Sequence, residues 1–258
     1  MKSWTTKGER SILRFLALNG KANRYEIKKG LERAKKLGEA EKDLTYQGIH
    51  SSMKKLIKNN LVRIVDESDA KSGGKKRIYA LSILGLFTII GLSNASLTQE
   101  KMNKIIENNK NKYFVFNEWN EISRNPEIKN HIINEIRIFI NRYGYYYSTI
   151  YKTTVINDTL IDEKSERNLL MEQYELSDSI FITKTLTRKI LGLDYLYIGL
   201  HKLKGSPPPY CLYYKTFDYF MKNPRLRSFI EKEIEYEDKR YKEIQKIKTI
   251  YSIPSSHP

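Results

Sequence analysis

The most informative segment of this chain is Thr45-Tyr46-Gln47-Gly48-Ile49-His50-Ser51-Ser52-Met53-Lys54-Lys55-Leu56, with Asn60-Leu61-Val62 shortly after it. Ile49, Met53, Leu56 and Ile57 recur at the spacing that places side chains on one face of an α-helix. This spacing predicts a helix over about 45–59. The apolar, β-branched run from Leu61 to Val65 predicts a strand directly after that helix.

Two further helices are predicted upstream of this stretch. The first ends at Asn19-Gly20, and Asn23 is a suitable N-cap for the second. The polar stretch from Lys35 to Asp43 predicts an extended helix end and a loop. Ile12, Leu13, Phe15 and Leu16 form an apolar face in the first helix, and the second helix contains Tyr25, Ile27 and Leu31.

Downstream, the sequence predicts a β-hairpin and a buried helix. Residues 69–74 include Gly73-Gly74 and predict a turn, after which residues 78–81 return as a second strand. The 22 residues from Ile78 to Gln99 carry no charge, which raises the alternative of a membrane span. A span needs about 20 predominantly apolar residues. The dense apolar part, Ala80–Leu92, has only 13 residues, so we expect a core helix here and not a membrane partner.

Three helices followed by a β-hairpin are the plan of a winged-helix domain, and the sequence resembles that of known members. Residues 23–31 resemble the second helix of the PadR-like group of winged-helix transcriptional regulators, in the broad class shared with MarR and ArsR regulators. Residues 45–62 resemble the recognition helix and strand entry, and residues 74–82 with Gly85 resemble the returning wing strand and next helix. The resemblance covers roughly residues 8–92. The sequence departs from it at Ser51, where members often carry proline, and in the polar insertion before Thr45.

The resemblance implies binding to duplex DNA, with the helix at 45–59 in the major groove and the hairpin at 68–77 against the backbone or minor groove. Gln47 has the amide geometry for adenine N6 and N7, and Lys54 has the reach for guanine or phosphate. The alternative is that these side chains form a solvated surface or bind protein. The expected DNA contacts are Thr45, Tyr46, Gln47, His50, Ser51, Lys54 and Lys58 on the helix and Lys71, Lys75, Lys76 and Arg77 on the hairpin.

The charge distribution favours a polyanionic partner at the N-terminal end. The 258 residues have a net charge of +16, of which residues 1–95 supply +11 and residues 96–258 supply +5. A single cysteine, Cys211, excludes an intramolecular disulfide, so a reducing, cytoplasmic setting is expected. The first residues do not resemble a signal peptide.

Signals for catalysis and metal binding are poor. The four histidines show no metal-ligand spacing, and no nucleophile motif is present. A site joining His131, His201 and Cys211 in space stays open. We expect no enzyme activity, no metal and no cofactor.

Residues 96–258 resemble no known family and are predicted to be mostly helical. Residues 145–156 are rich in aromatic and β-branched side chains, and a strand is the alternative there. The tyrosines at 143–151 pack a core or interface, line a ligand pocket or stack on bases. The expected helices are 98–111, 114–124, 127–143, 159–174, 180–203, 211–222 and 225–250.

The sequence therefore predicts a mainly α protein with two parts: a winged helix over 1–95 and a mostly helical domain over 96–258. The helical domain would serve dimerisation or ligand and partner binding, and nothing in the sequence supports a small-molecule effector directly. We expect a homodimeric, DNA-binding transcriptional regulator. The alternative function is a protein- or RNA-interaction module whose main surface is the helical domain, and a membrane-tethered regulator ranks behind it.

Overall fold

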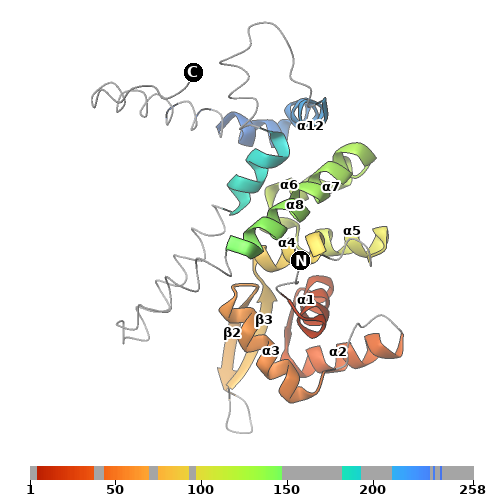
Figure 1. Ribbon diagram of the computed structural model, residues 1–258, viewed down its shortest axis with the longest axis vertical. Helices are drawn as coiled ribbons and strands as arrows, with labels where there is room; N and C mark the ends of the chain where they lie inside the picture. Colours follow the sequence, from red (N-terminus) through yellow and green to blue (C-terminus); the bar gives the residue numbers. More distant parts are fainter. Residues whose placement is uncertain are drawn as a thin grey trace, which may run out of the picture.

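The computed structural model describes residues 5–37, 44–69, 75–92, 97–146, 182–192 and 211–232, together with residues 235 and 239. The described part is mainly helical, with one small three-stranded antiparallel sheet. The sheet lies with α1 to α3 at one end of the molecule, and α12 lies at the other end (Figure 1). Between them lie α4, α5 and α8.

The three predicted N-terminal helices are confirmed. They are α1 (Lys7–Asn19), α2 (Arg24–Lys36) and α3 (Tyr46–Lys58). Thr6 and Asn23 each form a capping box with the acidic residue three positions on, so both helices begin at residues that satisfy their free N–H groups. Ile49, Met53 and Leu56 of α3 are buried, as their spacing predicts.

A left-handed residue ends α3 and directs the chain into the sheet. Asn60 has φ 51°, and the Leu61 N–H donates to the carbonyl of Leu56 at 2.9 Å while the Asn60 N–H donates to that of Ile57 at 2.9 Å. These two bonds form a Schellman motif, which satisfies carbonyls that the helix end would otherwise leave free. Asparagine tolerates this conformation better than most other residues.

The predicted hairpin is confirmed, but its strands are longer than predicted. They are β2 (Val62–Asp69) and β3 (Lys75–Leu81), with an irregularity in the register between Ile64 and Asp66. A short strand that the sequence did not predict, β1 (Lys21–Asn23), pairs with the other side of β3, so the order is β1-β3-β2. Three residues are too short for an alternating pattern to be visible in sequence.

The uncharged segment after the hairpin forms the core helix α4 (Ile83–Leu92), as expected. Its residues from Ile83 to Gly91 are buried, and it packs against α8 (Pro126–Tyr146). A Cβ atom on Gly91 would lie 3.2 Å from the Arg137 Cα, which shows how closely the two backbones approach. Over the residues that the structure describes, no helix has both the length and the apolar character needed to cross a membrane.

Several predicted helices of the second half are interrupted. The helix predicted over 98–111 is α5 (Gln99–Asn108) followed by a 3-10 turn, η1 (Lys110–Lys112). Between them, the Asn109 side chain donates both to the Ile105 carbonyl of α5 at 2.8 Å and to the Ala17 carbonyl at the end of α1 at 3.0 Å. The helix predicted over 114–124 is two short ones, α6 (Phe114–Asn117) and α7 (Trp119–Ile122). There, Glu118 pairs with Arg225 and Trp119 donates to Asn103, so tertiary contacts override helix propensity.

The remaining helices agree with the prediction in part. α12 (Cys211–Lys222) is confirmed, and residues 224–232 are helical. The helix predicted over 180–203 instead ends at residue 191, because Gly192 adopts φ 60° and so terminates it. The expectations for 145–156 and 159–174 fall wholly or mostly outside the described residues.

One hydrophobic core connects the two halves of the sequence. It contains side chains of α1 to α4 together with side chains of α5, α6, α7, α8 and α12. The Asn108 and Asn109 side chains also donate to the carbonyls of Leu18 and Ala17 at 2.6 and 3.0 Å, which satisfies the C-terminal end of α1. Core side chains therefore meet across the expected boundary at residue 95, and experiments on the N-terminal part need the full chain.

Candidate nucleic-acid interface

The N-terminal half of α3 presents most of its polar side chains to solvent. Thr45 caps the helix, and its hydroxyl accepts from the Gly48 N–H at 3.0 Å. Ile49, Met53 and Leu56 are buried on one face of α3, so the residues predicted to contact DNA lie on its opposite face. The exposed ones are Thr45, Tyr46, Gln47, Ser51, Lys54 and Lys58, while His50 is half-buried.

A residue of α2 that the sequence analysis did not single out, Arg24, lies against this helix. Its guanidinium donates to Nδ1 of His50 and lies 5.7 Å from the ring centroid of Tyr46. Arg24 reaches this place because Asn23 caps α2 and makes Arg24 its first residue. The sequence shows an N-cap, Asn23, followed directly by an arginine. It does not show which helix Arg24 contacts, because Tyr46 lies 22 residues further along the chain.

The contact with Arg24 determines the state of the His50 ring. An arginine side chain has donors only, so Nδ1 must accept and the ring is neutral, with its hydrogen on Nε2. Desolvation lowers the pKa of His50 first, and the positive charges of Arg24, Lys54 and Arg77 lower it further. Cations from α2, α3 and β3 therefore converge on one histidine. We call the surface formed by Arg24, Tyr46, Gln47, His50, Lys54 and Arg77 the α3 face.

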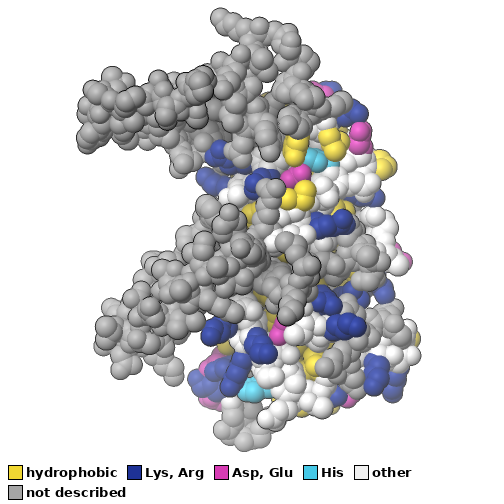
Figure 2. All heavy atoms as spheres, in the orientation of Figure 1, with side chains coloured by type: hydrophobic (Ala, Val, Ile, Leu, Met, Phe, Trp, Pro, Cys, Tyr) yellow, Lys and Arg dark blue, Asp and Glu magenta, His cyan; other side chains and the backbone are white. Residues whose placement is uncertain are grey.

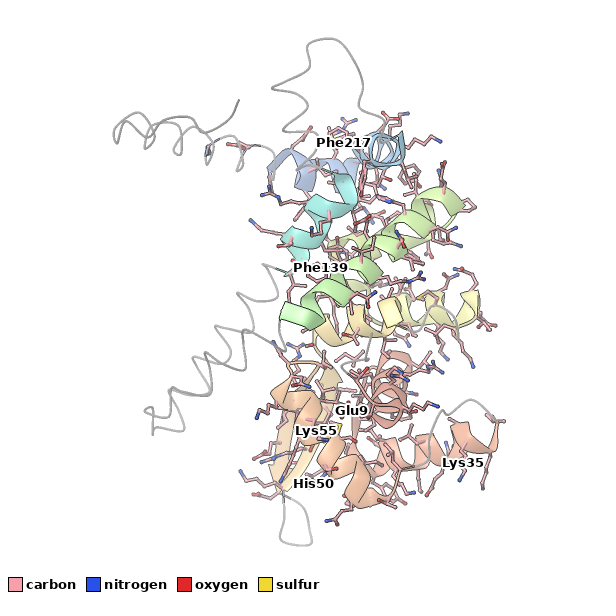
Figure 3. All side chains as sticks on the ribbon, in the orientation of Figure 1. Glu9, Lys35, His50, Lys55, Phe139 and Phe217 are labelled. Carbon is pink, nitrogen blue, oxygen red and sulfur yellow. The ribbon has the colours of Figure 1, made fainter. Side chains whose placement is uncertain are left out.

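The figures show the same arrangement. His50 and Lys55 project from α3 at the end of the molecule that carries the hairpin (Figure 3). In the space-filling view, Lys and Arg side chains gather beside a histidine over α3 and the hairpin (Figure 2). Lys55 is exposed on this helix as well and adds a positive charge that was not among the predicted contacts.

The predicted cations of the hairpin are divided between two environments. The Glu67 carboxylate accepts from Lys75 Nζ and from Arg77 Nε, each at 2.5 Å, and these two bonds hold its pKa below the ordinary value. Lys76 is paired with Ser68 of β2, and its side chain is exposed. Lys71 lies outside the described residues. The hairpin thus places a carboxylate between two of the three described cations that were predicted to contact DNA.

The other candidate sites receive no support from the described residues. Within that part of the chain, no group of three or more His, Cys, Asp and Glu side chains is placed to hold a metal ion. His131 is buried, and its Nε2 bonds to the Ile190 carbonyl at 2.8 Å, so it serves the core. His201 and the side chains of Cys211 and of the tyrosines at 143–151 fall outside what the structure describes.

Comparison with known proteins adds no family to this description: no protein-family model matches the chain, and no curated protein matches it either.

Proposed function

We propose that this protein is a DNA-binding transcriptional regulator that contacts duplex DNA with the α3 face and the β2–β3 hairpin. The observation that carries the proposal is the position of Arg24 of α2 against His50 and the Tyr46 ring of α3, on a helix that also exposes Gln47, Ser51 and Lys54. Positive side chains supply sequence-independent affinity for phosphates. Polar side chains at the N-terminal part of a recognition helix read base edges.

The arrangement of the elements supports a winged-helix interpretation of residues 5–92. Three helices pack together, the third is followed by an antiparallel hairpin, and β1 adds a third strand in the order β1-β3-β2. In this interpretation α3 enters the major groove and the hairpin lies alongside as the wing. This is the arrangement that the resemblance to PadR-like regulators implies.

Each polar residue on the α3 face has a role in this proposal. The Gln47 amide suits the N6 and N7 atoms of adenine, and the His50 Nε2–H suits an acceptor such as guanine N7 or O6. Lys54 and Arg24 face the phosphates, and Ser51 lies on the exposed side of the same helix.

The test is a salt series with the full-length chain and a fluorescent duplex of random sequence, followed by anisotropy. Binding is expected at low salt, with log K falling linearly against log salt concentration. Arg24→Ala and Lys54→Ala should each reduce that slope by about one unit. Lys104→Ala is the matched control, because Lys104 is an exposed cation on α5, away from the α3 face. Absence of duplex binding at low salt would refute the proposal.

A second candidate function is supported by exposed aromatic rings. Tyr25 and Tyr46 are 59% and 51% exposed, and both are flanked by cations, which suits a protein or RNA partner. This is the interaction-module alternative. Repeating the salt series with single-stranded RNA of the same length separates the two: tighter binding of RNA than of duplex DNA would favour the module.

We extend the proposal to a homodimer, because two recognition helices on adjacent half-sites increase specificity. One candidate interface is the apolar stripe that Leu226, Phe229 and Ile230 begin near the C-terminal end, but these three residues pack within the chain. Leu226 and Ile230 are buried, and the Phe229 ring stacks on Phe114 with centroids 3.7 Å apart. Leu226, Phe229 and Ile230 therefore serve the core, and a dimer interface would lie elsewhere than on these three residues. Light scattering on the intact protein gives the mass, and a monomer would refute this extension.

A further inference from the structure

Tyr46 and His50 lie on the same face of α3 and share one partner from another helix. They are four residues apart, which places their side chains one above the other on a helix. The Arg24 guanidinium lies over the Tyr46 ring, 5.7 Å from its centroid, and donates to Nδ1 of His50. Because an aromatic face attracts a cation, the Tyr46 ring helps to hold Arg24 where it meets His50.

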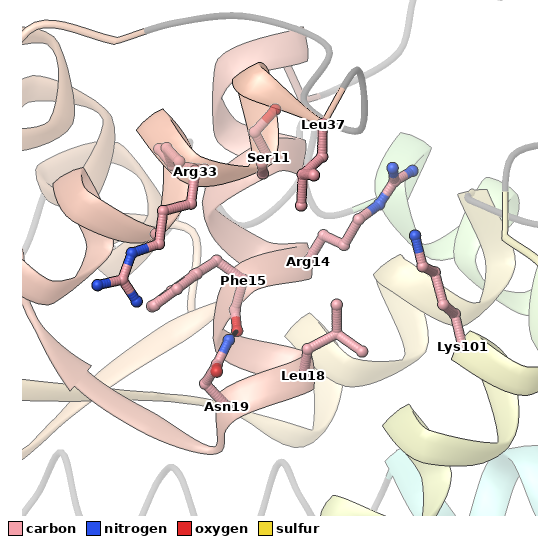
Figure 4. Close-up of a pocket in the computed structure, with 11 residues that line it drawn as sticks. Ser11, Arg14, Phe15, Leu18, Asn19, Arg33, Leu37 and Lys101 are labelled. Atoms are coloured by element: carbon pink, nitrogen blue, oxygen red, sulfur yellow. Dashed lines mark hydrogen bonds between the residues drawn. The ribbon is translucent and has the colours of Figure 1, made fainter.

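The backbone of Arg24 is fixed by the elements around it. Asn23, directly before it, caps α2 and is also the last residue of β1, which pairs with β3. The helix α2 packs closely on α1, because a Cβ atom on Gly30 would lie 1.9 Å from Cε2 of Phe15. Figure 4 shows the Phe15 side chain extending from α1 at the pocket between these two helices. Arg24 therefore reaches α3 from a fixed starting point.

The bond from Arg24 gives the His50 ring one hydrogen-bonding direction. In a neutral imidazole, the bond that one ring nitrogen makes determines which nitrogen carries the hydrogen. With Arg24 donating to Nδ1, Nε2 carries the hydrogen and donates. In the major groove, guanine presents two adjacent acceptors, N7 and O6. Adenine and thymine present one acceptor beside a donor or a methyl group, and cytosine presents a donor. A fixed donor therefore prefers guanine.

We infer that Arg24 is a positioning residue that fixes His50 as a hydrogen-bond donor, and that His50 thereby selects a guanine in the DNA bound by the α3 face. This inference rests on the proposed DNA binding. The bond to His50 uses one of the five N–H donors of a guanidinium, so it is compatible with the phosphate contact proposed for Arg24.

The experiment begins with selection of the preferred duplex from a random library by the full-length chain, at about pH 8, where an ordinary imidazole is neutral. Each guanine of that site is then replaced singly. The analogue 7-deazaguanine lacks the N7 acceptor, 6-thioguanine weakens the O6 acceptor, and inosine lacks only the amino group in the minor groove. At one guanine, 7-deazaguanine or 6-thioguanine is expected to weaken binding by about tenfold, and inosine by less than about twofold.

Two variants of α3 assign this loss to one side chain. His50→Phe keeps a ring but has no N–H, so the analogue that weakens binding to the wild type is expected to have no effect in this variant. Lys54→Ala is the matched control, because it removes a proposed phosphate contact from the same helix. It is expected to weaken binding to both duplexes alike and to keep the tenfold difference between them.

Two variants of Arg24 separate positioning from other effects. Arg24→Met has no donor, so the loss caused by the analogue is expected to fall to about threefold, and the nitrogen chemical shifts of the His50 ring should show both tautomers. Arg24→Lys is expected to restore the tenfold loss and the single tautomer, because an ammonium also only donates. Circular dichroism checks that each variant is folded.

The possible failures are distinct from one another. A preferred site without guanine, or an analogue effect that persists in His50→Phe, overturns the inference and leaves DNA binding in place. An analogue effect and a tautomer that are the same in Arg24→Met as in the wild type refute the positioning role of Arg24. Absence of binding to any duplex refutes the proposed function itself.

Discussion

At the scale of single residues, the contact between Arg24 and His50 leads to the first prediction. Arg24→Gln should raise the pKa of His50 toward its ordinary value of 6.5, because one of the charges that lower it is removed. The pKa should stay below 6.5, since desolvation is the larger cause and Lys54 and Arg77 remain. A pH titration of the ring by NMR measures both values.

The same titration extends to the complex with DNA. Phosphates near the α3 face would offset the three cations, so the pKa of His50 should be higher in the complex than in the free protein. A group whose pKa rises on binding takes up a proton between the two pKa values, and affinity then increases as pH falls through that window. His50→Gln should remove this dependence. A pH dependence that survives His50→Gln would assign it to another group.

Glu67 leads to the second prediction. Its carboxylate holds Lys75 and Arg77 in the free protein, so a phosphate must compete with it for both cations. Glu67→Gln should therefore strengthen duplex binding by roughly three- to tenfold at low salt, since exposed ion pairs are weak. Asp66→Asn is the control, because it removes the same charge from the neighbouring position on β2. Asp66 is paired with Ile78 of β3, whereas Glu67 is paired with Arg77. An equal gain in affinity for DNA in both variants would show that the change in net charge, and not the release of Lys75 and Arg77, causes the effect.

At the scale of elements, the junction between α3, the hairpin and α4 determines how the proposed wing meets the core. The Ser82 hydroxyl donates to the Asn60 carbonyl at 2.6 Å and accepts from the Gly85 N–H at 3.0 Å. The Ser82 N–H donates to the Leu61 carbonyl at 3.1 Å. The start of α4 therefore lies directly on the end of α3.

This close approach predicts a large cost for a small change. A Cβ atom on Gly85 would lie 2.0 Å from the Leu61 carbonyl oxygen, which belongs to the backbone and cannot rotate away. Gly85→Ala should lower the free energy of unfolding by about 3 kcal/mol, as overpacking does in cores. Gly48→Ala in α3 is the control, because its nearest contact is the Thr45 hydroxyl at 3.3 Å, and it should change stability by about 1 kcal/mol at most. Urea unfolding of the full chain measures both.

At the scale of the whole molecule, Lys112 connects the C-terminal half to the sheet. Its ammonium donates to the Leu81 carbonyl at 2.5 Å, at the end of β3. Desolvation, with a smaller contribution from Arg63, lowers its pKa to about 8. The unfolded chain, where the pKa is 10.5, therefore binds more protons than the folded protein between pH 8 and pH 10.5.

The sign of the resulting pH dependence is fixed by these two values. Burying Lys112 costs stability below pH 8, by about 3 kcal/mol at most, and this cost disappears as pH rises toward 10.5. The stability of Lys112→Met relative to wild type should therefore be highest near pH 7 and fall between pH 8 and pH 9.5. Urea unfolding of both proteins across this range measures the difference. A difference that does not change with pH would show that Lys112 does not titrate in this window.

The elements that the sequence determined by itself are those governed by nearby residues. The spacing of Ile49, Met53 and Leu56 predicted α3, and Asn23 predicted the start of α2, because side-chain periodicity and capping act within one or two turns. The hairpin and the buried character of α4 followed from local composition in the same way. These elements were therefore predicted within a few residues of their observed ends.

The contacts between distant residues depend on the packing of the folded chain. This packing placed Arg24 on His50, added β1 to the sheet, and brought Asn109 at the end of α5 to the Ala17 carbonyl. Each of these depends on segments that are far apart along the chain, and one sequence carries no local signal for such pairs. Which side chains of α3 are exposed was thus predictable from the sequence, while the charges that surround them depend on how α2, α3 and β3 pack.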